Sequence, residues 1–100
     1  MTLLERRDTN AVAHLTMNAP ERLNALSDEM LAALQDEFDT LKDDSSIRAI
    51  TLSGSGKAFC AGHDLKQMTA GRQSEDGGRD YFADLFNRCT TMMQTIQLLP

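Results

Sequence analysis

Several residue types are scarce in this sequence. Its 100 residues include no tryptophan and one tyrosine, and no apolar run approaches the roughly 20 residues that a membrane-spanning helix needs. Basic residues are also few, because 10 Lys and Arg stand against 15 Asp and Glu, for a net charge of -5 and a pI near 4.8. Binding to nucleic acid or to an anionic membrane needs an excess of positive charge. We therefore expect neither as a partner.

Cysteine is scarce too. Cys60 and Cys89 are too few for a disulfide framework. The N-terminal residues MTLLERRDTN contain no apolar core of the kind that a secretory signal needs. Because thiols stay reduced in the cytoplasm, we expect a cytoplasmic protein with two free thiols.

The chain begins with a strand pattern. Two short, partly apolar runs, residues 3–7 and 11–17, flank the turn formers DTN. This arrangement predicts a β-hairpin. The following NAPERLNAL is interrupted by Pro20 and indicates an ordered loop.

An amphipathic helix follows. Ser27 can cap its first turn, where the two acidic residues DE suit the helix dipole. Apolar residues then recur at spacings of three and four, which predicts a helix over residues 28–42. The next apolar run, residues 47–52, fits a buried strand, so the order of elements predicts an α/β fold with a parallel strand pair. The apolar face of the helix consists of Leu31, Leu34, Phe38 and Leu41.

The second half of the chain combines a polar segment with another helix. Residues 64–68 are expected to form a short helical turn, and the Gly-rich residues 69–80 a mobile loop. From Tyr81 onward a broad apolar stripe predicts a helix. The stripe is wider than a domain of this size covers easily, so we expect part of it to be exposed and the chain to be incomplete. It consists of Phe82, Leu85, Phe86, Cys89, Met92, Met93, Ile96 and Leu99.

The stretch GKAFCAGHDLKQM, residues 56–68, gathers several reactive residue types. A nucleotide-binding phosphate loop needs Gly, four residues and then Gly-Lys-Ser/Thr, but Thr51 stands at its first position and Ala58 follows the lysine. Cys60 and His63 lack the second ligand pair that is typical of zinc sites. We therefore expect neither a phosphate loop nor a metal.

Two interpretations of this stretch remain, and neither uses a reactive side chain. Catalysis by Cys60 is not indicated, because a cysteine between Phe and Ala is typical of a small buried residue. A strand ending at Gly54, followed by small residues and a helix start at His63, can present N–H groups to a developing negative charge. An ordinary strand-to-helix turn fits the same residues, with glycine needed only for its backbone conformation. The residues by themselves favour this second interpretation.

Two motifs in this sequence resemble a known family. FCAGHDLKQM resembles the AG-x-DL segment of the enoyl-CoA hydratase/isomerase (crotonase) superfamily. The upstream NAPERLNAL resembles that family's early loop of the form Asn, Pro, then Leu-Asn-Ala-Leu, placed before a helix. The strand RAITLSGSGKAF joins the two in the family's order and at about its spacing, so the resemblance covers nearly the whole chain.

The resemblance implies a fold, a ligand and an assembly. The fold is a crotonase-like α/β spiral of ββα units, of which residues 1–100 are the N-terminal part. The ligand is an acyl-CoA thioester, with coenzyme A carried as part of the substrate and no separate cofactor. The implied reaction is hydration of a 2-enoyl-CoA or isomerisation of its double bond, with the thioester enolate held in an oxyanion hole. The implied assembly is a homotrimer or hexamer.

The resemblance also assigns residues by motif position. The backbone N–H of His63 is implied to be one oxyanion donor, and Ala61 and Gly62 allow the thioester to approach. Lys66 stands where the family often has a basic residue near the CoA phosphates. The implied substrate- and CoA-binding residues are Arg22, Leu23, Ala25, Ala61, Gly62, His63, Asp64, Leu65 and Lys66.

Two features depart from the family pattern. His63 stands where Ala or Gly is common. Its imidazole either lies at the pocket wall, where it narrows the choice of substrate, or faces solvent or packs on the next turn, which we expect. The second oxyanion donor and the two hydratase glutamates have no match in this sequence, and Glu75 matches neither glutamate. We therefore expect the 100 residues alone to be inactive. The alternative to an enzyme is a non-catalytic acyl-CoA-binding or assembly module of the same fold.

Overall fold

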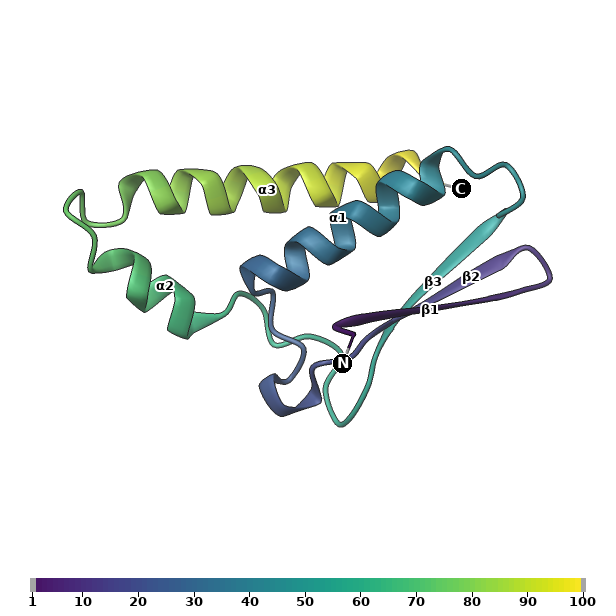
Figure 1. Cartoon of the computed structure of the whole chain (residues 1–100), viewed down its shortest axis with the longest axis horizontal. Helices are drawn as coiled ribbons and strands as arrows, with labels where there is room; N and C mark the ends of the chain where they lie inside the picture. Colours follow the sequence, from purple (N-terminus) through teal and green to yellow (C-terminus); the bar gives the residue numbers. More distant parts are fainter. Residues whose placement is uncertain (1, 100) are drawn as a thin grey trace.

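The computed structural model describes residues 2–99, in which a ββα unit is followed by a strand and two helices (Figure 1). The mixed α/β class expected from the sequence is confirmed. The strands are β1 (Leu4–Thr9), β2 (Val12–Met17) and β3 (Ala49–Gly54). A short 3₁₀ helix covers Pro20–Arg22, and the α-helices are α1 (Asp28–Lys42), α2 (Leu65–Arg72) and α3 (Arg79–Leu98).

The three strands form one sheet in the order β1-β2-β3. β1 and β2 pair antiparallel as the predicted hairpin, and β2 and β3 pair in parallel, with Leu15 opposite both Arg6 and Leu52. The hairpin turn is Asn10 and Ala11 rather than the expected DTN, because Asp8 and Thr9 continue β1. Both turn residues have a positive φ that suits a tight two-residue turn. Parallel pairing needs a crossover connection, which α1 supplies.

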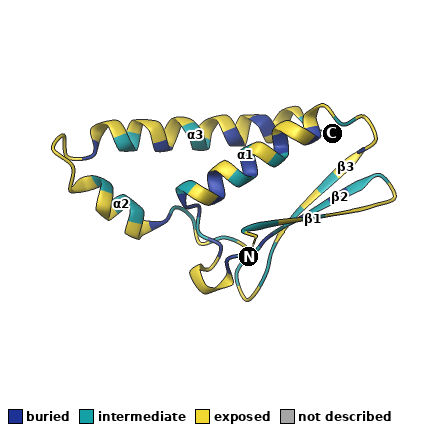
Figure 2. Ribbon diagram, viewed as in Figure 1, coloured by how far each residue is buried: buried dark blue, intermediate teal, exposed yellow. Residues whose placement is uncertain are grey.

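Helix α1 lies between the sheet and α3 (Figure 1). Its bounds agree with the predicted residues 28–42, and Ser27 Oγ accepts a hydrogen bond from the Met30 N–H at 3.1 Å, which caps the first turn. Figure 2 shows buried residues along this helix. The core consists of Met30, Leu31, Leu34, Phe38 and Leu41 of α1, Ala13, Leu15 and Met17 of β2, and Leu85 and Met92 of α3 with a few loop residues.

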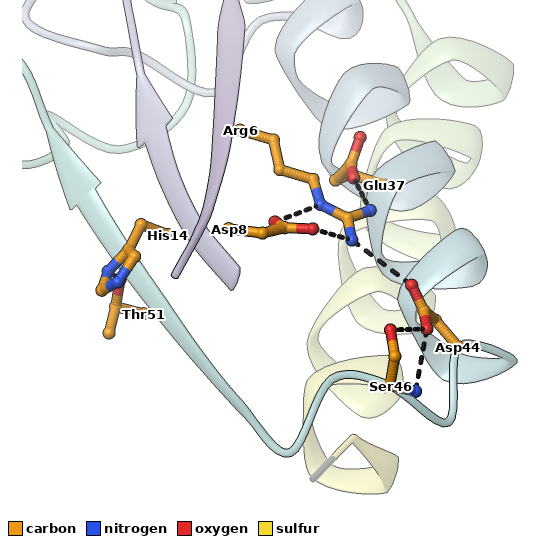
Figure 3. A network of polar contacts seen from close by, with 7 residues as sticks. All are labelled: Arg6, Asp8, His14, Glu37, Asp44, Ser46 and Thr51. Atoms are coloured by element: carbon orange, nitrogen blue, oxygen red, sulfur yellow. Dashed lines mark hydrogen bonds and ion pairs between the residues drawn. The ribbon is translucent and has the colours of Figure 1, made fainter. Parts of the chain in front are cut away.

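Arg6 fixes α1 to the edge strand β1 (Figure 3). Its guanidinium donates to Glu37 of α1 at 2.8 Å and to Asp8 of β1 at 2.8 Å. It also lies 3.4 Å from Asp44, in the loop that follows α1. Hydrogen bonds from Arg6 lower the pKa of Asp8, and hydrogen bonds from Ser46 lower that of Asp44. The lowered pKa values favour the charged forms of Asp8 and Asp44 beside Arg6.

Strand β3 begins two residues later than predicted. It covers Ala49–Gly54 rather than residues 47–52. Ile47 is buried but packs in the turn before the strand, where the Arg48 N–H donates to the Ala11 carbonyl oxygen at 2.7 Å. The predicted strand therefore began too early, because it included the apolar residue Ile47, which is buried in the preceding turn.

The predicted mobile loop over residues 69–80 is too long. The last turn of α2 and the first turn of α3 take its ends, which leaves residues 73–78 as the connection. Helix α3 begins earlier than predicted because a carboxylate binds the N–H groups at its start, which the composition of residues 69–80 does not indicate. Asp76 accepts hydrogen bonds from the N–H groups of Gly78 and Asp80 at 2.9 and 3.0 Å. Mobility of the connection stays a prediction.

Helices α2 and α3 form a more open part of the molecule. The radius of gyration is 14.7 Å, compared with about 13 Å for a compact domain of this length. Helix α2 contains no buried residue, and α3 contains three in 20 (Figure 2). The expected partial exposure of the apolar stripe is confirmed, since Phe86, Met93 and Ile96 are exposed. None of the helices within residues 2–99 is long and apolar enough to cross a membrane.

Candidate functional site

Two loops that are far apart in the sequence run side by side near the end of the sheet. The Ala61 N–H donates to the Leu23 carbonyl oxygen at 3.0 Å, and the Leu26 N–H donates to that of Gly62 at 2.6 Å. The Asp64 N–H then donates to the Leu26 carbonyl oxygen at 3.3 Å. The two motifs identified in the sequence therefore form one continuous backbone structure.

The backbone amide of His63 is left free by this pairing. Leu26 forms a parallel bridge opposite His63 and exchanges its hydrogen bonds with Gly62 and Asp64, the residues on either side. Because successive N–H groups of extended backbone point in opposite directions, the His63 N–H points away from Leu26. Within residues 2–99 it has no hydrogen-bond acceptor. Gly62, with a φ of 96°, makes the turn that precedes this amide.

Asn24 holds the first loop in place. It is fully buried, its Oδ1 accepts from the Ala19 N–H at 2.8 Å, and its Nδ2 donates to the carbonyl oxygens of Ser55 and Ala58, both at 2.9 Å. Gly54 makes room for this contact, because a Cβ there would lie 2.8 Å from the Asn24 Nδ2. The sequence analysis missed this positioning residue. An asparagine between apolar residues in an ordered loop was the available signal, since asparagine tolerates the positive φ of 53° found here.

A groove of about 540 Å³ opens between these loops and the start of α2. Of the nine residues predicted to bind substrate and CoA, only Gly62 is absent from its lining. Glu21 and Met68 also line the groove and were not predicted. Glu21 adjoins the predicted residue Arg22, and Met68 lies one helical turn after the predicted residue Leu65. The eight predicted residues in the lining are Arg22, Leu23, Ala25, Ala61, His63, Asp64, Leu65 and Lys66.

Asp64 has a structural role that the sequence did not show. Its Oδ1 accepts hydrogen bonds from the N–H groups of Lys66 and Gln67 at 2.9 and 3.2 Å, which caps α2. Its Oδ2 lies 3.9 Å from Arg22 Nη1, whose side chain is 59% exposed. Arg22 and Lys66 thus place two exposed positive charges at the groove of a chain with a net charge of -5. Such a pair suits an anionic group such as a phosphate.

Gln67 ties the start of α2 to the start of α1. Its Oε1 accepts from the Asp28 N–H at 2.7 Å, and its Nε2 donates to Glu29 at 3.0 Å. Hydrogen bonds from its own backbone N–H and from Gln67 lower the pKa of the Glu29 carboxyl. The helix that forms one side of the groove is therefore anchored on the packed core.

The His63 imidazole lies differently from our expectation. It packs against α3, where its ring meets Phe86 edge to face with a centroid distance of 6.0 Å, instead of facing solvent or the next turn. Its Nδ1 is buried and has no hydrogen-bond partner among residues 2–99. The sequence could not show this contact, because the two residues are far apart along the chain.

The other reactive side chains do not assemble into a site. Within residues 2–99 no group of three or more His, Cys, Asp or Glu side chains is arranged to hold a metal ion. Cys60 and Cys89 are free thiols. The Cys60 sulfur accepts a hydrogen bond from the Gly62 N–H at 3.4 Å, which supports the turn before His63. The chemistry of the groove therefore rests on its amide, its two cations and its apolar lining.

Comparisons with known proteins agree with the motifs. Residues 7–96 match the sequence model of the enoyl-CoA hydratase/isomerase family. The mitochondrial enoyl-CoA hydratase domain-containing protein 3 of Xenopus laevis is 34% identical over 100 residues, which are 100% of this chain and 32% of that protein. The 1,2-epoxyphenylacetyl-CoA isomerase of Escherichia coli is 48% identical over 54 residues, which are 54% of this chain and 21% of the isomerase.

A solved structure shows the same arrangement of elements. The crystal structure of an enoyl-CoA hydratase from Mycobacterium smegmatis is 51% identical and superposes with a TM-score of 0.89 over 100% of this chain and 37% of that one. The fold is therefore that of the N-terminal part of such enzymes. The chain spans about a third of the length of the relatives that it matches over its whole length.

Proposed function

Because the chain belongs to the enoyl-CoA hydratase/isomerase family, we propose that the whole protein binds an acyl-CoA thioester in the groove beside α2. The thioester oxygen accepts a hydrogen bond from the His63 N–H, which serves as one donor of an oxyanion hole. The reaction is hydration of a 2-enoyl-CoA or isomerisation of its double bond, both of which pass negative charge to that oxygen.

One observation carries this proposal. His63 lines the groove and its N–H has no acceptor within residues 2–99, while the residues on both sides are fixed by hydrogen bonds to Leu26. A preorganised donor of this kind stabilises developing charge without further reorganisation, and removal of one oxyanion-hole donor from a serine protease costs about 3 kcal/mol of transition-state stabilisation. The amide is thus suited to an enolate-like intermediate.

The groove lining supports the choice of ligand. Arg22 and Lys66 are positioned to attract the phosphates of coenzyme A, as its only basic lining residues within residues 2–99. The rest of the lining is largely apolar and can contact the pantetheine chain and the adenine ring. These apolar residues are Leu23, Ala25, Ala61, Leu65 and Met68.

The acid and base of the reaction come from outside the described residues. Glu21 and Asp64 are the only carboxylates in the groove lining within residues 2–99. Glu21 is exposed, and Asp64 is committed to the N–H groups of α2. The same observation fits a second function, that of a non-catalytic acyl-CoA-binding module of the same fold, because such a module needs no acid or base.

Binding and turnover by the whole protein test the two functions separately. We expect saturable binding of crotonyl-CoA by calorimetry, weakened about fivefold by either Arg22→Ala or Lys66→Ala because each exposed charge contributes roughly 1 kcal/mol. Lys42→Ala, at the end of α1, is the matched control and leaves the affinity unchanged. Loss of the enoyl thioester absorbance of crotonyl-CoA identifies a hydratase, and appearance of that absorbance from a 3-enoyl-CoA identifies an isomerase. Saturable binding without turnover of either substrate identifies the binding module. No saturable binding of any acyl-CoA overturns both.

A further inference from the structure

A second cavity adjoins the groove. It measures about 460 Å³ and lies between α2 and α3. Leu65 and Met68 line both hollows, so the two are neighbours along the same face of α2. The second cavity is mainly apolar and is lined by Leu65, Met68, Thr69, Arg72, Phe82 and Phe86.

Two aromatic side chains stand at the boundary between the cavities. His63 lines the groove but not the second cavity, and Phe86 lines the second cavity but not the groove. Their rings are in edge-to-face contact, with centroids 6.0 Å apart and an angle of 73° between planes. The contact between these rings therefore joins the lining of the groove to that of the second cavity, beside the shared residues Leu65 and Met68.

Other aromatic rings of α3 pack behind Phe86. Phe86 stacks on Phe82 with a centroid distance of 6.1 Å, and Phe82 contacts Tyr81 edge to face at 5.4 Å. The Tyr81 hydroxyl donates to Asp28 at 3.4 Å, which connects the row to α1. Because the His63 Nδ1 has no partner within residues 2–99, packing on Phe86 is what orients the imidazole.

We propose that His63 determines the specificity for the acyl group, because its imidazole, backed by Phe86, closes the groove toward the second cavity. This inference rests on the proposed function. The amide that holds the thioester oxygen and the ring that closes the groove belong to one residue, so the closure lies within a side chain's length of the carbonyl. The substrate class is accordingly a short-chain acyl-CoA, and removal of the ring joins the two cavities into one that admits a longer apolar chain.

Chain-length preference in the whole protein tests this inference. We measure kcat/KM, or affinity if there is no turnover, for a four-carbon and a ten-carbon 2-enoyl-CoA, and compare the ratio within each variant so that a general loss of function cancels. Wild type favours the four-carbon substrate. His63→Ala shifts the ratio toward the ten-carbon substrate by at least about tenfold, since each methylene that becomes buried adds roughly fourfold.

Three further variants make the test specific. Phe86→Ala removes the support behind the ring and shifts the ratio in the same direction. His63→Phe keeps a ring at the boundary and retains the wild-type ratio. Met93→Ala, which truncates another half-exposed side chain of α3 that lines neither cavity, also leaves the ratio unchanged.

The outcomes separate this inference from the proposed function. An unchanged ratio in His63→Ala, or a wild-type preference for the ten-carbon substrate, overturns the role of His63 while acyl-CoA binding stands. If His63→Ala does not fold, the ratio in Phe86→Ala decides by the same criterion. If wild type binds neither substrate, the proposed function fails first.

Discussion

The sheet with α1 and the pair α2–α3 are stabilised in different ways. In the first region α1 buries five residues and β2 buries three in one core, to which α3 adds Leu85 and Met92. In the second region α2 buries none, and apolar side chains such as Leu65 and Phe86 stay exposed beside cavities. The first region is thus a scaffold, whereas the second presents apolar surface for a ligand. The groove lies where the two regions meet.

Truncation of one leucine in each region is expected to give the largest difference in the free energy of unfolding. Leu34→Ala removes a side chain that is 1% exposed and should lower the free energy of unfolding by about 4 kcal/mol, because it leaves a cavity in the core. Leu65→Ala, at a residue that is 74% exposed, should change it by less than about 0.5 kcal/mol. Urea unfolding of the two variants measures the difference. Equal losses would mean that α2 is packed as tightly as α1.

Asn24 joins the loop of the groove to the scaffold, and its loss should have the next largest effect. Asn24→Ala leaves one N–H and two carbonyl groups without their partner, so we expect about 3 kcal/mol less stability and weaker acyl-CoA binding. Unfolding and calorimetric binding measure both. Asn18→Ala, in the same loop but with a partly exposed side chain, is the control. Wild-type affinity in Asn24→Ala would show that the loop keeps its shape without these bonds.

The cap of α2 should have a smaller effect. Asp64→Ala removes the acceptor of two N–H groups and should lower stability by about 1 kcal/mol, with faster amide exchange confined to the first turn of α2. Asp64→Asn retains a capping oxygen and should restore most of the protection. Hydrogen exchange read residue by residue separates the two variants. Exchange that stays slow at Lys66 and Gln67 in Asp64→Ala would contradict the capping role.

The smallest effect is expected at the start of α3, as a dependence on pH. Hydrogen bonds from the Ser74 hydroxyl and from the N–H groups of Asp80 and Gly78 lower the pKa of Asp76 to about 2. Because this pKa lies below the unfolded value near 3.9, the contribution is complete above about pH 4 and is lost as the pH falls toward 2.

Amide exchange at Asp80, followed from pH 5 to pH 2, should therefore show the helix start opening in this window. Asp76→Asn removes the pH dependence. Glu75→Gln, at a neighbouring carboxylate that makes no side-chain hydrogen bond within residues 2–99, preserves it. An Asp76 carboxyl that titrates near pH 4 in the folded protein would contradict this assignment.

The comparison of the two regions also explains what the sequence could predict. The bounds of α1, its apolar face and its Ser27 cap follow from local periodicity and were predicted correctly. The hairpin and the parallel pairing were predicted from the same kind of signal. The end of α2 and the start of α3 were not predicted correctly. The start of α3 depends on the carboxylate of Asp76, which accepts hydrogen bonds from backbone amides.

The functional site likewise has features that the sequence predicted and features that it did not. Motif positions identified residues that the structure brings together in one groove, among them His63. The motifs did not predict the buried bonds of Asn24 or the contact between His63 and Phe86, because both join segments that are distant along the chain. The role of the groove residues in CoA binding, the homotrimeric or hexameric assembly and the cytoplasmic location stay predictions.

The His63 amide proton provides the most direct test of the central claim. In the whole protein labelled with ¹⁵N-histidine, with His63→Asn used to assign the resonance, saturation with an acyl-CoA should move the His63 amide proton strongly downfield. Free coenzyme A, which has no thioester oxygen, should not produce this shift, and the His14 amide in β2 should stay in place with both ligands. A His63 amide that does not move when the acyl-CoA is bound would contradict the account.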